Sequence, residues 1–134
     1  VKDLDFGIRE IIVREGKGAK DRRTVLPEAL IPALNDQVCR VRKLLAYDIF
    51  CGVDEVYLPN ALARKYPSAG REPGWQFLFP ASSTGIDPNG KKRRRHHTHP
   101  SWVRKKLKDA VRAAGITKRI TCHTFRHSFA THLL

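Results

Sequence analysis

The chain has 134 residues, and with 41% of them hydrophobic it can form one folded domain or part of one, which excludes disorder throughout. The net charge of +13 is uneven: residues 1–90 hold 13 Lys/Arg against 12 Asp/Glu, whereas residues 91–134 hold 13 against Asp109 alone. This excess of positive charge in residues 91–134 favours nucleic acid as the partner. The sequence contains no lipidation motif or long apolar run. Three widely spaced cysteines and no visible signal peptide lead us to expect a reducing cytosol.

Residues 1–27 predict a small antiparallel sheet, because two β-branched runs, 11–13 and 24–26, flank a tip rich in glycine and charge. Gly16 and Gly18 flank Lys17, so the backbone can take positive φ on either side of the lysine and hold its side chain out from a turn. Two interpretations stay open. The lysine either reaches into a groove or belongs to an ordinary solvated turn.

Residues 28–50 predict a helix, in which apolar side chains recur at spacings of four and three, namely Leu30, Leu34, Val38, Val41 and Leu45. Pro27 and Pro32 are compatible only with its first turn. We expect its basic residues to form an ordinary solvated face, made of Arg40, Arg42 and Lys43.

Residues 51–99 are unusually long for a connection, and glycine or proline interrupts them every few residues as far as Gly90. Long ordered loops are usually functional. We expect a short helix over residues 60–66, capped by Asn60, and a short strand over residues 75–80, where Phe77 and Phe79 alternate. Trp75 is either a core aromatic or a platform on which a base stacks.

Residues 91–95 are five consecutive cations, which repel one another unless an anion neutralises them. A helix is predicted over residues 100–115, with Thr98 or His99 as its cap, Pro100 in its first turn and Gly115 as its stop. We expect its apolar stripe to be buried, made of Val103, Leu107, Ala110, Val111 and Ala114. Its other side offers a basic face that can track a phosphate backbone, made of Arg104, Lys105, Lys108 and Arg112.

The histidines, together with Cys122, offer nitrogen and sulfur ligands for zinc. The usual paired spacings are absent, however, and the adjacent cations oppose a divalent ion. We therefore expect neither a metal site nor any other cofactor.

Residues 121–134 predict a further helix, on which His123 and Arg126 lie three apart on one face. Their Cβ atoms are then about 5–6 Å apart, so both side chains can touch one phosphate. Phe125, Phe129 and Leu133 repeat every four residues, the pattern of a helix packed into a core. By itself this stretch is more typical of an amphipathic helix with a surface arginine and a hydrogen-bonded histidine.

Read together, the hairpin lysine, the basic helix and the His-x-x-Arg stretch resemble the catalytic domain of tyrosine site-specific recombinases of the phage-integrase family. The general resemblance rests on Gly16-Lys17-Gly18, Arg22, Leu26-Pro27 and residues 123–133. Resemblance to the integron integrase subgroup rests on residues 58–67, Gly74-Trp75 and Arg94-Arg95-His96-His97.

The resemblance implies an α+β fold that is mainly α, with a small antiparallel sheet or hairpin near the N-terminus followed by helices. All of residues 1–134 would be part of the catalytic domain. Its segments would be a hairpin region (1–27), a helix (28–50), an integron-type insertion with loops (51–99), a basic helix (100–115) and the start of the His-x-x-Arg helix (121–134).

The resemblance also implies a mechanism. A tyrosine hydroxyl attacks a DNA phosphodiester, leaving a 3'-phosphotyrosyl enzyme and a free 5'-hydroxyl, and a second 5'-hydroxyl reverses the step. Arg126 matches the cation that stabilises charge on the phosphoryl oxygens. His123 matches the residue that hydrogen-bonds the phosphate and helps to move the nucleophile's proton. Lys17 matches the general acid for the departing 5'-oxygen, with Lys20 as a nearby competitor.

DNA contacts are implied for Lys20, Arg22, Trp75, Pro88, Arg94, Arg95, His96 and His97. In integron integrases the inserted segment helps to recognise folded single-stranded sites with extruded bases. Trp75 would stack on such a base, beside a pocket lined by Pro88, His96 and His97. The implied partners are duplex DNA, folded single-stranded sites and further copies of the full-length protein on DNA, in the cytoplasm of a bacterium. No membrane or small-molecule substrate is expected.

The sequence also departs from the family pattern. That pattern has another arginine before the hairpin, and a further His or Trp and the nucleophilic tyrosine after His-x-x-Arg. The tyrosines of this chain are Tyr47, Tyr57 and Tyr66, all before His123, so none matches the nucleophile. We therefore expect an internal fragment that is inactive alone. The alternative is a non-catalytic, basic nucleic-acid-binding module.

Overall fold

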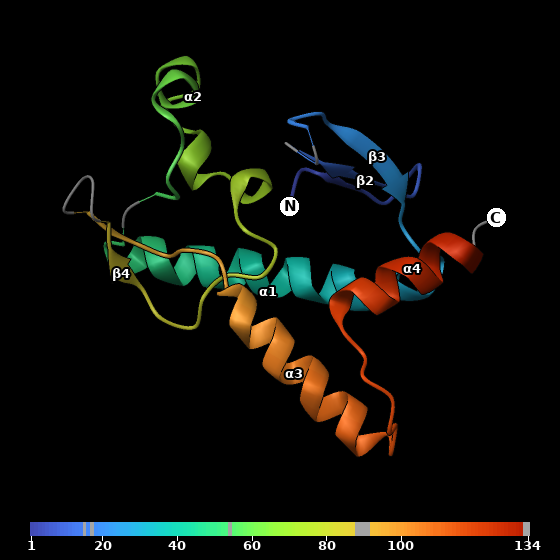
Figure 1. The fold of residues 1–134 in the computed structure, drawn as a ribbon. Helices are drawn as coiled ribbons and strands as arrows, with labels where there is room; N and C mark the ends of the chain where they lie inside the picture. The colour runs from blue at the N-terminus through green and yellow to red at the C-terminus, as the bar shows by residue number, and fades with distance from the viewer. Residues whose placement is uncertain (15, 17, 54, 88–91, 133–134) are drawn as a thin grey trace. The chain divides into compact units, whose positions relative to one another are not determined.

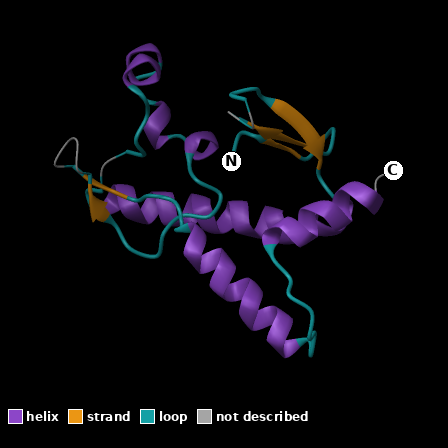
Figure 2. Cartoon of the chain, viewed as in Figure 1, coloured by secondary structure: helices purple, strands orange, loops and turns teal. Residues whose placement is uncertain are grey.

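The structure is a computed structural model that describes residues 1–14, 16, 18–53, 55–87 and 92–132 (Figure 1). The chain divides into two compact units, residues 1–97 and 98–134. Short antiparallel strands and longer helices make up the described part (Figure 2), so the α+β prediction is confirmed.

The first unit opens with a three-stranded antiparallel sheet of β1 (Leu4–Asp5), β2 (Glu10–Val13) and β3 (Arg22–Val25), in the order β1-β2-β3. Two residues of β2 are paired on both sides: Glu10 lies opposite Asp5 and Val25, and Ile11 lies opposite Leu4 and Thr24. The predicted sheet is therefore confirmed. Leu26 follows β3 and is the most deeply buried large side chain, with 1% of its surface exposed.

Helix α1 (Ile31–Phe50) follows a 3-10 turn over Glu28–Leu30. Val38 and Val41 are buried and Leu34 and Leu45 are half-buried, so the predicted stripe does face the core along the helix. Leu30 is half exposed because it belongs to the 3-10 turn that precedes the helix. The basic residues Arg40, Arg42 and Lys43 are exposed, as expected.

The irregular segment that follows contains α2 (Asn60–Lys65), two 3-10 turns (Ala69–Arg71 and Pro73–Trp75) and a hairpin of β4 (Gly85–Ile86) and β5 (Arg93–Arg94). The predicted short helix is confirmed. Its predicted cap is wrong, because Pro59 occupies the capping position and Asn60 is the first residue of the helix.

The strand predicted over residues 75–80 is wrong. In this stretch only Pro80 makes a β-bridge, an isolated one with His97. Scattered partners take the place of a neighbouring strand here, because Gln37 Nε2 donates to the Leu78 carbonyl oxygen at 2.8 Å and the Val1 amino group donates to the Gln76 carbonyl oxygen at 2.8 Å. Alternation of two aromatics therefore did not require a strand.

A small core of its own holds this irregular segment together. Val56 and Ala69 are 5% and 1% exposed, and the Val56 N–H donates to the Gly70 carbonyl oxygen. A Cβ atom on Gly70 would lie 2.7 Å from Cβ and Cγ of Glu55. The close approach of these two backbone stretches therefore requires glycine at position 70.

The second unit consists of α3 (Pro100–Ala113), a connecting segment and α4 (Cys122–His132). The predicted ends of α3 are confirmed: His99 caps it, with Nδ1 accepting from the Ser101 N–H, and Gly115 ends it with a φ of +65°. None of the described helices is long and apolar enough to cross a membrane.

The predicted burial in this unit is wrong. Leu107 and Val111 of α3 are half-buried, but the rest of its apolar stripe is exposed, made of Val103, Ala110 and Ala114. On α4, Phe125 is 56% exposed and Phe129 is 37% exposed, while Leu133 lies outside the described residues. Two helices and one connection offer too little apolar surface to cover both stripes.

Candidate nucleic-acid interface

Two threonines start α4 and so fix the place of His123. The Thr121 N–H donates to Thr124 Oγ1 at 3.1 Å, and the Thr124 N–H donates to Thr121 Oγ1 at 3.4 Å. This reciprocal pair is a capping box in which threonine replaces the usual glutamate. It puts His123 in the first turn, where helix N–H groups and the helix dipole favour an anion.

His123 and Arg126 are both exposed on α4, as an encounter with a phosphate requires. The nearest polar partner of His123 is His127, whose Nε2 lies 2.8 Å from Nε2 of His123. The two rings meet edge to face, with centroids 4.3 Å apart. From the sequence, His127 was considered only among possible zinc ligands and was not paired with His123, although their spacing of four residues was a readable signal.

His123 also lines a groove of about 790 Å³ within the second unit. Apolar side chains line part of the groove, namely Leu107, Val111, Ile116 and Ile120. Five cations line it as well: Arg104, Lys108, Arg112, Lys118 and Arg119. Such a groove attracts a polyanion, and three of the four residues of the predicted basic face contribute to it.

All of the predicted basic face of α3 is exposed, including Lys105. Trp102 is 53% exposed at the start of the same helix, and Lys106 Nζ lies 5.8 Å from its ring centroid. Trp102 and Lys106 are therefore both accessible to a nucleic acid that binds along α3.

Arg95 of the basic run is bound inside the first unit. Its Nε lies 2.6 Å from Oδ2 of Asp48 and its Nη2 lies 2.7 Å from Oδ1, and Nη1 donates to the Ala81 carbonyl oxygen at 2.7 Å. The side chains of Arg95 and Asp48 are 13% and 10% exposed. These hydrogen bonds to Asp48 raise the pKa of Arg95 above its usual value.

Arg94 is also directed inward. It is 9% exposed, its Nε lies 3.3 Å from Oδ2 of the buried Asp87, and its Nη1 donates to the Glu55 carbonyl oxygen. Lys92 Nζ lies 3.6 Å from the carboxylate of Glu55. The anions that neutralise part of the basic run are thus carboxylates of this chain.

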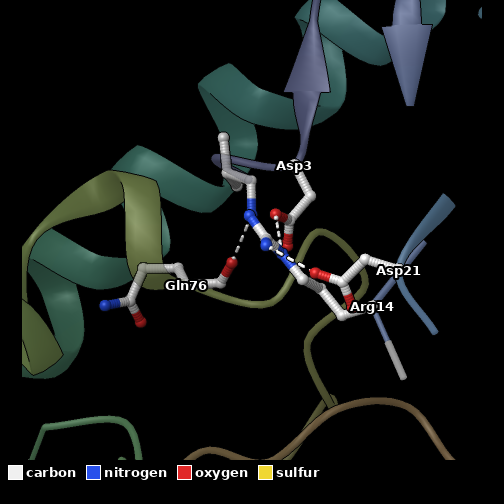
Figure 3. A network of polar contacts seen from close by, with 5 residues as sticks. Asp3, Arg14, Asp21 and Gln76 are labelled. Carbon is white, nitrogen blue, oxygen red and sulfur yellow. Dashed lines mark hydrogen bonds and ion pairs between the residues drawn. The ribbon is translucent and has the colours of Figure 1, made fainter. Parts of the chain in front are cut away.

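Arg14 closes the loop that carries the predicted general acid, just beyond the ends of β2 and β3 (Figure 3). Its Nη1 lies 2.8 Å from Asp21 Oδ2 and its Nε lies 3.0 Å from Asp3 Oδ1. The hydrogen bonds to Asp21 and then Asp3 raise the pKa of Arg14. Nearby, the Gln76 carbonyl oxygen accepts from the N-terminal amino group of Val1 at 2.8 Å.

Lys17 itself lies outside the described residues. Beside it, Gly18 takes a φ of +79°, whereas Gly16 does not take a positive φ. Lys20 and Arg22 are exposed, in the loop and at the start of β3. Both of these cations are accessible to a phosphate backbone.

Trp75 is half-buried and contacts two side chains. Its ring is tilted on that of Tyr66, with centroids 5.9 Å apart, and Lys2 Nζ lies 2.9 Å from its centroid. Burial of this ammonium lowers the pKa of Lys2. Trp75 also lines a pocket of about 360 Å³ in the first unit, together with Lys2 and Phe77.

The remaining residues predicted to contact DNA differ in their exposure. His97 is exposed, and its ring meets that of Phe77 at 5.4 Å, which connects it to the wall of the pocket of Trp75. His96 is half-buried, and its carbonyl oxygen accepts from the Ala81 N–H. Pro88 lies outside the described residues.

Comparison with known proteins identifies the family. The model of the phage integrase family matches residues 1–134. The chain belongs to the phage integrase family.

Similar members of the phage integrase family carry related names. Two proteins, each called integrase/recombinase, from Escherichia coli and Pseudomonas aeruginosa, are 49% identical to this chain over 134 residues. A protein called tyrosine recombinase, from Thermosipho africanus, is 31% identical over 132 residues, covering 98% of this chain and 31% of that protein. The chain spans 40% of the length of the first two relatives.

The buried pair of Arg95 and Asp48 leads to a stability prediction. Asp48→Ala leaves the Arg95 guanidinium buried without its counter-ion, so the free energy of unfolding should fall by about 3–5 kcal/mol. Urea denaturation followed by circular dichroism measures it. The matched control is Asp36→Ala, which removes an exposed carboxylate from the same helix and should change stability by less than about 0.5 kcal/mol. Equal losses in the two variants would contradict the prediction.

Proposed function

We propose that this chain is an internal part of the catalytic domain of a tyrosine-type site-specific DNA recombinase, which integrates or exchanges DNA through a 3'-phosphotyrosyl intermediate. The observation that carries the proposal is the pair His123 and Arg126, exposed together on α4, in a chain that matches the phage integrase family throughout. The cationic groove beside His123 supports it, because DNA is a polyanion.

In this proposal each residue has a separate task. Arg126 holds the non-bridging phosphoryl oxygens and stabilises the charge that develops on them. His123 donates a hydrogen bond to the same phosphate and helps to move the proton of the nucleophilic tyrosine. Lys17 gives a proton to the 5'-oxygen as its bond to phosphorus breaks. One phosphodiester is exchanged for another, so the net reaction needs neither ATP nor a metal ion.

We further propose that the recombinase is of the integron integrase type and that the insertion recognises folded single-stranded sites. Trp75 would stack on an extruded base, which displaces the Lys2 ammonium from its place over the ring and leaves it to contact a neighbouring phosphate. His97 lies next to this pocket, because its ring contacts the ring of Phe77, which lines the pocket together with Trp75. Pro88 and His96 complete the proposed set.

The contacts of Arg94 and Arg95 favour a structural task within that insertion. Both guanidinium groups are held by carboxylates and carbonyl oxygens of the first unit, so neither is presented to a phosphate in this conformation. We propose that they shape the insertion, while Lys20, Arg22 and the basic face of α3 contact the DNA backbone. Self-association of the full-length protein on DNA and a location in the bacterial cytoplasm complete the proposal.

Strand transfer by the complete protein separates this proposal from a non-catalytic DNA-binding module. Arg126→Lys should lower the rate of strand transfer by at least about 10²-fold, because a lysine cannot hold two phosphoryl oxygens in one plane. DNA affinity, measured by fluorescence anisotropy, should remain within about threefold. Arg119→Lys, which changes another cation of the second unit, is the control and should keep strand transfer. Unchanged transfer in Arg126→Lys would support the module instead.

The 134-residue chain alone should bind DNA without cleaving it, because none of its tyrosines matches the nucleophile. A suicide DNA substrate, in which the released 5' end diffuses away, tests this expectation by denaturing electrophoresis. A covalent adduct between the chain and the 3' end of the DNA would refute it.

The integron assignment predicts a preference for extruded bases. In the complete protein, Trp75→Ala should weaken binding to a bulged hairpin by about 1–3 kcal/mol and leave binding to plain duplex nearly unchanged. Trp102→Ala is the matched control, since Trp102 also lies beside a lysine ammonium but belongs to the basic helix. It should affect the two DNA forms alike. Equal losses for both DNA forms in Trp75→Ala would reject the assignment.

A further inference from the structure

The contact between His123 and His127 has a geometry that a phosphate site does not need. The two Nε2 atoms lie 2.8 Å apart, and the rings are nearly perpendicular, at 85°. Both side chains are exposed, one helical turn apart. In the metal-free pair one Nε2 must donate and the other accept, so a single proton is shared between two nitrogen lone pairs.

Two imidazole nitrogens one helical turn apart can also chelate a metal ion, once both rings turn their Nε2 lone pairs toward it. With metal–nitrogen bonds of 2.0–2.1 Å, nitrogens 2.8 Å apart subtend an angle of about 86° at a metal ion placed between them. A tetrahedral ion would need a nitrogen separation of about 3.3 Å. Square-planar and octahedral ions, by contrast, take neighbouring ligands at right angles.

We propose that His123 and His127 form a two-nitrogen chelate for a divalent transition-metal ion that prefers right-angle nitrogen ligands, such as Ni²⁺ or Cu²⁺. Binding displaces the shared proton from Nε2 of the donor ring, and that ring carries its proton at Nδ1 instead, so both imidazoles coordinate through Nε2 as neutral rings and no net proton is released. Among the described residues no group of three His, Cys, Asp or Glu side chains is placed to hold a metal. Water therefore completes the coordination shell.

The local charge sets the strength of this chelate. His123 lines a groove with Lys118 and Arg119, and Arg126 lies on the same helix as the pair. These cations repel a divalent ion, so the chelate binds weakly at low ionic strength. Added salt screens the repulsion and strengthens binding, which is the opposite of what the same charges do to DNA binding.

A bound ion also withdraws Nε2 of His123 from a phosphate, because a nitrogen bonded to a metal carries no proton to donate. This consequence rests on the proposed function, whereas the chelate itself does not. If Ni²⁺ binds the pair but leaves strand transfer by the complete protein unchanged, the assignment of His123 to the phosphate fails and the chelate stands.

The chelate is tested by titrating the 134-residue chain with Ni²⁺ in the absence of DNA, following histidine imidazole signals by NMR. Cys39, Cys51 and Cys122, all exposed, are first replaced by serine to remove competing thiols. Paramagnetic Ni²⁺ should broaden His123 and His127 before any other histidine. His127→Gln and His123→Gln should each weaken this first binding event at least tenfold.

His132→Gln is the matched control, because His132 lies on the same helix, five residues beyond His127. It should leave the affinity unchanged. Raising NaCl from 50 to 300 mM should strengthen binding to the pair by about twofold or more through screening. First broadening at His96, His97 or His99, or an unchanged affinity in His127→Gln, would overturn the proposal.

Discussion

The ion pair between Arg95 and Asp48 is the interaction on which the first unit depends. It joins α1 to the end of the irregular segment, 47 residues further along the chain, through two short hydrogen bonds. Both side chains are nearly buried, so each would be costly without the other. The third hydrogen bond, from Arg95 Nη1 to the Ala81 carbonyl oxygen, draws a second stretch of the same segment to the pair. The small apolar core around Val56 and Ala69 then needs to supply only local packing.

This arrangement separates two populations of cations that look alike in the sequence. Lys92, Arg94 and Arg95 lie near carboxylates of the first unit, at Glu55, Asp87 and Asp48. The cations of α3 are exposed, and several of them line a groove with His123. The net charge of the last third therefore overstates what is available to DNA near the basic run. For α3 the net charge is a better measure of the cations that DNA can reach, because acidic residues near them in the sequence are few.

His123 connects the proposed recombinase chemistry with the proposed metal chelate. A capping box holds it in the first turn of α4, and His127 meets it one turn later. All of these contacts are local to one short stretch of helix. A metal ion bound to the pair leaves Nε2 of His123 without a proton to donate to a phosphate, so the two exclude each other at that nitrogen. Metal occupancy would thereby be a means of silencing the phosphate site without altering the fold.

The sequence by itself determined the local features: the antiparallel sheet, the length of α1, the cap and stop of α3, and the spacing of His123 and Arg126 on one helix face. These follow from patterns within a few residues. Tertiary structure alone decided the partners of Arg94 and Arg95, since their carboxylates and carbonyls lie between 7 and 47 residues away. The sequence did carry one signal that a cation is buried here. Asp48 continues the apolar stripe of Val41 and Leu45, and a buried carboxylate needs a cation as its partner. The exposure of Phe125 and Phe129 was likewise undecidable from periodicity, because a helical stripe records which side is apolar and not whether anything covers it.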